Sequence, residues 1–259
     1  DRPTRVSALL RLRELCGRSD MVTSLLAIAA AAKPEDPFSI GDDTNCSAAC
    51  TPSVGQRSSS LPNVLLLSDS IGATGTGYYT NVRALLGNSS DSVSGAGAVG
   101  NAAVVHTGGY GRGRCGTSYG VVACAPLWVG GGGWDVIHFN WGLHDICASM
   151  YAPVSLAEYE ANMEELYSVL KAALAPNGTL IWSTTTPVPP SYKARNNSDV
   201  VALNALMQRK FGPGSEHPDV LMSDLYGAVV SRCARDPAAA GYPQHSDCDV
   251  LQSRGVHFS

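Results

Sequence analysis

Short apolar segments alternate with helix-like segments from about residue 61 onward, and this alternation constrains the fold more than any other feature. The strand-like segments are residues 64–67, 102–106, 135–141, 179–184 and 220–222. The helix-like segments are residues 78–86, 155–175, 200–211 and 225–234. The longest of these begins at Ser155, with Glu158 three residues later, which is the pattern of a capping box. Strands joined by crossover helices form a parallel sheet covered on both faces. We therefore expect a doubly wound α/β domain, a three-layer α/β/α sandwich around a five-stranded parallel sheet.

Residues 1–61 read as an N-terminal extension to a main domain of residues 62–259. Leucine spacing predicts helices within residues 1–33, whereas residues 34–61 are rich in Pro, Ser, Asp, Gly and Cys and indicate an irregular segment pinned by a disulfide. The extension is either a strap on the main domain or the tail of an upstream unit. The apolar run at residues 21–32 is too short to cross a bilayer, so we expect no membrane span. The chain begins with Asp1, and we expect that a signal peptide has been removed.

Eight cysteines and four N-glycosylation sequons together favour an oxidising environment, so we expect a secreted glycoprotein. The sequons begin at Asn45, Asn88, Asn177 and Asn196. Sequence alone does not determine the connectivity of eight cysteines. The pairings that we predict are the short closures Cys46–Cys50, Cys115–Cys124 and Cys233–Cys248. The alternative is a set of buried thiols in a cytosolic protein.

Composition and charge exclude several classes of partner. The net charge is −4 and no stripe of Lys or Arg is present, which argues against nucleic-acid binding. No Cys-x-x-Cys motif occurs and the six histidines are scattered, so we expect neither a metal nor a cofactor. Only 15% of the residues are charged and 27 are glycine, which is typical of a compact, loop-rich globular protein.

Ser70 and His257 are the candidate catalytic pair. In a parallel sheet, reactive residues lie just beyond the carboxyl ends of the strands, and Ser70 follows the first predicted strand at the start of a helix. There its hydroxyl is exposed, and helix N–H groups stabilise negative charge. The alternative is an ordinary N-cap serine. His257 lies in a late loop, where a histidine can take the serine proton and return it to the leaving group.

Two further segments follow strands and carry polar or backbone donors. Asn140, His144 and Asp145 follow the third strand, where buried polar groups are costly unless they are hydrogen-bonded. They form either a hydrogen-bonded loop or donors aimed at an oxyanion. Residues 108–117 are rich in glycine, so their backbone N–H groups can approach a ligand closely. No Gly-Lys-Ser/Thr follows them, so they do not form a phosphate-binding loop.

In this order and spacing, the segments resemble the SGNH (GDSL-type) hydrolase family over residues 62–259. Residues 65–71 look like the family's first block, Gly-Asp-Ser, with Ser68 in place of the glycine. Residues 141–145 look like the third block, Gly-x-Asn-Asp, with His144 at the asparagine position.

The end of the chain looks like the fifth block, Asp-x-x-His. Residues 255–258 carry its histidine, but Arg254 stands at the aspartate position. Residues 134–145, 183–189 and 223–226 resemble a bacterial and algal branch of the family. Family members usually continue into a final helix, which we expect this chain to lack.

The resemblance implies a flavodoxin-like fold and ester hydrolysis through an acyl-enzyme, without a metal or cofactor. By position, Ser70 would be the nucleophile and His257 its base. The oxyanion hole would be formed by the backbone N–H of Ser70, by a glycine of the second block, either Gly113 or Gly116, and by the side chain of His144.

Because Arg254 stands where the resemblance places the triad aspartate, the sequence does not identify the acid of the triad. Loss of the acid in a well-studied protease lowers turnover by roughly 10⁴. Three arrangements are open: Asp247 or Asp249 substitutes, a backbone carbonyl orients His257 in a Ser–His dyad, or the protein is catalytically weak.

The favoured function is therefore that of a secreted ester hydrolase acting on short acyl esters, such as the O-acetyl groups of glycans. We expect Asn140, Trp141 and Tyr110 to contact the substrate, and Trp128 to join the two aromatic residues in a sugar subsite. The alternative for these aromatic residues is ordinary core or rim packing. Two other functions are considered: a glycan-binding or structural module that keeps the fold, and an acyltransferase of the same fold.

Overall fold

The structure is a computed structural model. It describes residues 46, 50, 57–73, 77–87, 99–107, 113–147, 153–189, 192, 194–233 and 256–258. The helices expected in residues 1–33 lie outside the described residues, as does most of the irregular segment.

A five-stranded parallel sheet forms the centre of the protein. Its strands are β1 (Asn63–Ser68), β2 (Asn101–His106), β3 (Trp134–Asn140), β4 (Leu174–Ser183) and β5 (Leu221–Ser223). All four pairings are parallel, in the order β2-β1-β3-β4-β5. This is the flavodoxin-like order, so the predicted fold class is confirmed.

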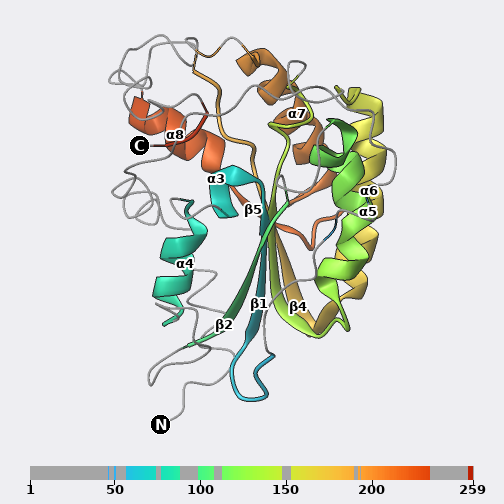
Figure 1. Ribbon diagram of the computed structural model, residues 1–259, viewed down its shortest axis with the longest axis vertical. Coiled ribbons are helices and arrows are strands. Elements are labelled where there is room, and N and C mark those ends of the chain that lie inside the picture. The colour runs from blue at the N-terminus through green and yellow to red at the C-terminus, as the bar shows by residue number, and fades with distance from the viewer. Residues whose placement is uncertain are drawn as a thin grey trace.

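Helices cover both faces of the sheet. They are α3 (Ser70–Ala73), α4 (Tyr79–Leu85), α5 (Ser118–Val129), α6 (Leu156–Ala172), α7 (Asn197–Lys210) and α8 (Leu225–Cys233), with the short 3₁₀ helix η2 (Gly113–Gly116). Figure 1 shows α4 and α8 on one side of the sheet and α5 and α6 on the other. None of the helices in the described ranges combines the length and the apolar character that a membrane span requires.

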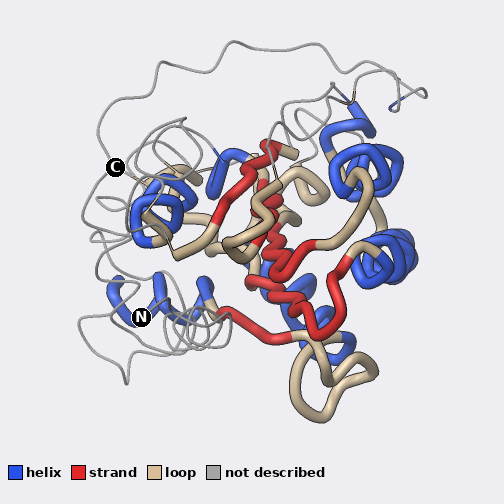
Figure 2. The backbone as a smooth tube through the Cα atoms, turned by 90° about the horizontal axis from the view of Figure 1, so that it is seen from below, coloured by secondary structure: helices blue, strands red, loops and turns tan. Residues whose placement is uncertain are grey.

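The two faces of the sheet carry separate apolar cores, because successive side chains of a strand point in opposite directions. Leu65, Leu67 and Phe139 belong to the larger cluster, to which α5, α6 and α7 also contribute. Val64 and Leu66 belong to the smaller cluster, together with α4. Figure 2 shows the strands crossing the molecule between these helical layers.

Helix α6 begins at the predicted N-cap residue but ends earlier than expected. Ser155 is the N-cap residue, and its hydroxyl accepts a hydrogen bond from Glu158 N at 3.2 Å. The helix ends at Ala172, and β4 begins two residues later. The register between β3 and β4 shifts there, and Asn177 has a φ of 65°. Residues 176–178, which lie between the predicted helix and the predicted strand, thus form an irregular stretch within β4.

The sequence pattern does not predict α5. Its residues are almost all apolar and include Pro126, so no helical periodicity is visible and the proline argues against a helix interior. The helix forms because its inner side contributes Val121, Cys124 and Trp128 to the larger core.

The disulfide pairings differ from the predicted ones. Cys46 is bonded to Cys115 and Cys50 to Cys124. Cys115 and Cys124 lie nine residues apart in η2 and α5, which at about 1.5 Å per helical residue separates them by roughly 13 Å. Bridged cysteines have Cα atoms within about 7 Å, so the predicted Cys115–Cys124 pair is wrong. The predicted Cys46–Cys50 pair is also wrong, because each of these cysteines is bonded to a residue of η2 or α5. Cys248 of the third predicted pair, Cys233–Cys248, lies outside the described residues, so this pair stays a prediction.

The two bridges attach part of the predicted extension to the main domain, and Arg57 adds a third contact. Its guanidinium lies 3.8 Å from the ring centroid of Trp134 and donates to Val129 O at 3.0 Å. It also donates to Gly132 O. A cation beside the last carbonyls of α5 is favourable for the helix dipole.

Two of the predicted glycosylation sequons lie in the described part of the chain. Asn177 and Asn196 are both exposed, so each amide is accessible to a modifying enzyme. Asn45 and Asn88 lie outside the described residues.

Candidate active site

The carboxyl ends of the parallel strands meet at one edge of the sheet. Ser68, the last residue of β1, is in register with His106 in β2 and with Asn140 in β3. Ser183 in β4 is in register with Ser223 in β5. The candidate residues follow these strand ends, as expected for an open α/β sheet.

A tight turn at the end of β1 presents Ser70 as the first residue of α3. Asp69 Oδ1 accepts a hydrogen bond from Ile71 N at 2.9 Å, and Ser68 Oγ accepts one from Gly72 N at 3.1 Å. A Cβ at Gly72 would lie 2.5 Å from Ser68 Oγ, so the turn closes this tightly only around glycine. Ser68, which departs from the family's first block, therefore holds the turn that carries Ser70.

His257 lies beside Ser70, although 187 residues separate them in the chain. Nε2 of His257 is 2.7 Å from Ser70 Oγ, and both side chains are partly buried. The neighbours of the histidine anchor it. Val256 is buried and Phe258 partly buried, both in an apolar cluster with Ile71. The Ser–His contact is thus supported by packing on both sides.

The comparisons with known proteins add little to this contact. No protein-family model and no curated protein matches the chain. Among solved structures, it is similar to the crystal structure of a Bacteroides fragilis protein provisionally described as an acylhydrolase. The two are 14% identical with a TM-score of 0.43, over 71% of this chain and 74% of that chain.

The loop after β3 is bound to the end of β4. Asn140 Nδ2 donates to Ser183 O at 2.9 Å and to Thr184 O at 3.0 Å. Gly142 has a φ of 142°, and a Cβ there would lie 2.5 Å from Thr185 Oγ1. The amide of Asn140 is thus engaged by the backbone. A contact between Asn140 and a substrate stays a prediction.

The two tryptophans predicted to line a sugar subsite, Trp128 and Trp141, are in the core. Trp141 is 3% exposed and packs against Phe139, and Trp128 is fully buried. The burial of Trp141 favours the alternative of core packing, because the residue after a buried strand is turned into the core. A contact between Trp141 and a substrate stays a prediction. Tyr110 lies outside the described residues.

His144 and Asp145 form part of a buried turn, with exposed fractions of 8% and 1%. Asp145 Oδ1 accepts a hydrogen bond from Ser118 N, the first residue of α5, at 2.9 Å. Gly113 and Gly116 are the first and last residues of η2, which ends just before α5. This bond therefore connects the two segments that were predicted to carry oxyanion donors.

Two buried carboxyl groups lie in the turns of the site. Burial raises the pKa of Asp145 to about 7, although the hydrogen bonds from Ser118 oppose the rise. Burial likewise raises the pKa of Asp69 to about 6, opposed by the hydrogen bond from Ile71 N. The negative charge of Asp69 also contributes to the raised pKa of Asp145. Both groups hold a proton more readily than exposed aspartates do.

The predicted substitutes for the triad acid, Asp247 and Asp249, lie outside the described residues, as does Arg254. Asp224, which follows β5, is an acidic residue at the same edge of the sheet, but its carboxylate bonds to the neighbouring turn. Its Oδ1 accepts hydrogen bonds from Thr184 Oγ1 and Gly227 N, at 3.1 and 2.9 Å.

A buried histidine network lies on the sheet near this edge and is missed by the sequence analysis. Tyr79 OH donates to Leu67 O at 2.7 Å and lies 2.8 Å from His138 Nδ1, while Ser183 Oγ lies 2.7 Å from His138 Nε2. Because the tyrosine has one proton, His138 Nδ1 donates to it and Nε2 accepts from Ser183. Burial lowers the pKa of His138 to about 4, so the ring is neutral. The available signal was a histidine between the apolar residues Ile137 and Phe139 of a buried strand.

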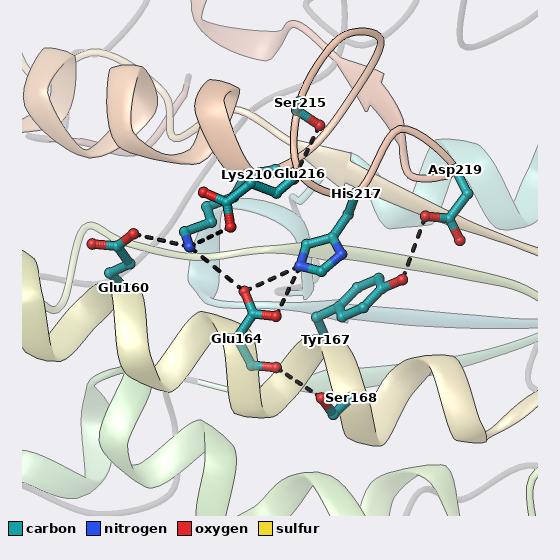
Figure 3. Close-up of polar contacts among 9 residues, drawn as sticks. All are labelled: Glu160, Glu164, Tyr167, Ser168, Lys210, Ser215, Glu216, His217 and Asp219. Atoms are coloured by element: carbon teal, nitrogen blue, oxygen red, sulfur yellow. Dashed lines mark hydrogen bonds and ion pairs between the residues drawn. The ribbon is translucent and has the colours of Figure 1, made fainter.

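The described residues contain one group with metal-ligand geometry: Glu164, Glu216 and His217. Figure 3 shows the ammonium of Lys210 between Glu216 of this group and Glu160 of α6. The distances to their carboxylates are 2.7 and 3.0 Å. His217 Nε2 lies 2.8 Å from Glu164. Each carboxylate of the cluster thus already has a partner within the protein, and the cluster connects α6 to the segment between α7 and β5.

Proposed function

We propose that this protein is a serine ester hydrolase that acts through an acyl-enzyme. The observation that carries the proposal is the 2.7 Å distance between His257 Nε2 and Ser70 Oγ at the carboxyl edge of the sheet. The resemblance of the Ser70, His144 and His257 segments to the SGNH family supports the same reading.

Ester cleavage follows from this pair in two balanced steps. Ser70 Oγ attacks the carbonyl carbon while His257 Nε2 takes the hydroxyl proton, and the imidazolium then protonates the departing alcohol. The product is an ester of Ser70 and the acyl group. In the second step water attacks this ester, His257 takes a proton from the water, and the proton returns to Ser70 as the carboxylic acid leaves. No cofactor takes part.

The oxyanion of each tetrahedral intermediate would be bound by the backbone N–H of Ser70, a glycine N–H of η2 and the side chain of His144. Preorganised donors of this kind are among the largest contributions to acyl-transfer catalysis. Asp247 or Asp249 would orient His257, or a backbone carbonyl would do so. Changing each aspartate to Asn separates these cases, because loss of a true triad acid lowers kcat by about 10⁴.

We place the reaction outside the cell and infer a small substrate. Two disulfides in the described residues support an oxidising compartment. The substrate class is a short acyl ester, with the O-acetyl groups of glycans as the first candidates. The burial of Trp141 removes one argument for a sugar subsite, so acetyl and butyryl esters of both sugars and simple alcohols belong in the same assay.

The test combines covalent labelling with turnover. Wild type, Ser70→Ala and His257→Gln are treated with a fluorophosphonate and assayed with p-nitrophenyl acetate. His217→Gln is the matched control, because His217 is also a partly buried histidine with a hydrogen-bonded Nε2 but lies beside α6.

We expect labelling of wild type and His217→Gln at Ser70, and loss of labelling and turnover in Ser70→Ala. His257→Gln should lose at least about 10³ in kcat. Absence of labelling in folded wild type, or labelling at another serine, would overturn the proposal and favour a non-catalytic module. Transfer of the acyl group to a sugar in preference to water would identify an acyltransferase.

A further inference from the structure

The carboxylate of Asp145 lies at the amino end of α5 and accepts the hydrogen bond from Ser118 N. Both residues are 1% exposed. The N-cap residue, Thr117, makes no side-chain capping bond, so Asp145 provides the acceptor from a distant part of the chain. An acceptor oxygen at this position is also favoured by the dipole of the 12-residue helix.

The turn that carries Asp145 is itself fixed by its backbone. Asp145 N donates to Gly142 O at 3.1 Å, and its carbonyl oxygen accepts from Val154 N at 3.1 Å. Arg195 Nε donates to Leu143 O at 2.6 Å within the same turn. The backbone of Asp145 therefore cannot move relative to the neighbouring His144 without breaking several bonds.

The other side of the contact is equally rigid. Gly116 lies two residues before Ser118, at the end of η2. Cys115 in η2 is bonded to Cys46, and a Cβ at Gly120 would lie 2.0 Å from Cys115 O. η2 and the start of α5 are thus packed as one unit, which the Asp145–Ser118 bond joins to the turn of His144.

We propose that Asp145 is a positioning residue that holds the η2 segment and His144 in a fixed relative position, and so aligns the two outer arms of the oxyanion hole. This inference rests on the proposed esterase function. Asp145 touches neither the substrate nor Ser70 in this role. It acts through Ser118 and through its neighbour in the chain.

The structure offers a matched control in Asp135, a second buried carboxylate that accepts a backbone N–H. Its Oδ2 accepts from Asn63 N at 2.8 Å, at the amino ends of β1 and β3, opposite the site. Asp145→Ala and Asp135→Ala each leave one buried N–H without its acceptor. A merely structural role predicts the same behaviour for both variants.

The assay measures kcat and KM for p-nitrophenyl acetate at a temperature where circular dichroism shows each variant folded. We expect Asp145→Ala to lower kcat by about 100-fold with KM changed less than about threefold, as for a misplaced oxyanion donor. Asp145→Asn keeps an acceptor oxygen for Ser118 N and should recover most of this loss. Asp135→Ala should lower the melting temperature but keep kcat within about twofold of wild type.

Ser118→Pro tests the same bond from the donor side if Asp145→Ala does not fold. Proline is tolerated at the first position of a helix, and Thr117 has the extended backbone that precedes proline, with ψ near −178°. This variant lacks both groups of Ser118 that bond to Asp145, the N–H and the hydroxyl, and should show the same loss of kcat.

Three results separate the two proposals. An active wild type with unchanged kcat in both Asp145→Ala and Ser118→Pro overturns the positioning role and leaves the esterase intact. An equal loss of kcat in Asp135→Ala also overturns it. An unlabelled wild type overturns the esterase function itself.

Discussion

The two disulfides should stabilise the fold in a non-additive way that can be calculated from their spacing. Each bridge taken alone closes a long loop, with sequence separations of 69 and 74 residues. In the chain-entropy account, such a loop is worth about 4.4 kcal/mol at 25 °C. When the other bridge is already present, the additional loop is much shorter. It consists of the four steps from Cys46 to Cys50 and the nine from Cys115 to Cys124.

A loop of about 13 residues is worth about 3 kcal/mol in the same account. Removing either bridge from the wild type should therefore lower the free energy of unfolding by about 3 kcal/mol. Removing the second bridge afterwards should lower it by about 4.4 kcal/mol, because the long loop is then released. The combined loss, about 7 kcal/mol, is comparable with the total stability of many domains.

Urea unfolding of wild type, Cys46→Ala/Cys115→Ala, Cys50→Ala/Cys124→Ala and the fourfold variant measures these values. The cavities left by the missing sulfurs lower stability in every variant, but they are nearly additive and cancel in the double-mutant cycle. The cycle should show a coupling of about 1.5 kcal/mol between the bridges. Strictly additive losses, or a loss of less than about 1 kcal/mol for each pair, would refute the reasoning.

Three further predictions follow from the described contacts. Because burial lowers the pKa of His138 from 6.5 to about 4, the unfolded chain binds a proton between these pH values that the folded protein does not bind. His138 should therefore lower the free energy of unfolding by about 3 kcal/mol as the pH drops from 6.5 to 4, and urea titrations should show this as the difference in slope between wild type and His138→Gln, since the opposite contributions of Asp69 and Asp145 are present in both proteins. Gly72→Ala should lower kcat for p-nitrophenyl acetate by at least about 100-fold, because the new methyl group displaces the turn that carries Ser70. The control is Gly131→Ala, which has no atom within 4 Å of the added Cβ and should keep the wild-type rate. Equal rates for the two variants would contradict the assigned turn. The side-chain amide of Asn204 bonds to both the N–H and the C=O of Thr185, at 2.8 and 2.9 Å. Asn204→Ala should therefore lower the free energy of unfolding in urea by about 2–4 kcal/mol, and a loss below about 1 kcal/mol would show that water replaces the amide.

Much of the architecture could be predicted because its signals are local. The strand at residues 64–67 is short and wholly apolar, and it corresponds to β1, buried on both faces. Ser155 and Glu158 mark the start of α6 within one residue. Helix α5 was not predicted, because a helix that is apolar on nearly every side shows no helical periodicity in its apolar residues.

The candidate site was predictable only in outline. The rule that reactive groups follow strand ends indicated Ser70 and the turn at His144, and the family blocks indicated His257. The same reasoning placed Trp141 in a subsite, whereas the side chain is in the core. A tryptophan just past a buried strand has the same local sequence whether it turns outward or inward.

The sequence by itself determined the class of fold, because strand and helix periodicity and the need for crossover connections leave few arrangements for such a chain. Only the tertiary structure decided which cysteines pair, that Asp145 caps a helix 27 residues away, and that His138 is held neutral between Tyr79 and Ser183. These contacts join segments distant in the chain. They depend on distances across the sheet and on burial, and neither quantity has a signature in the neighbouring residues.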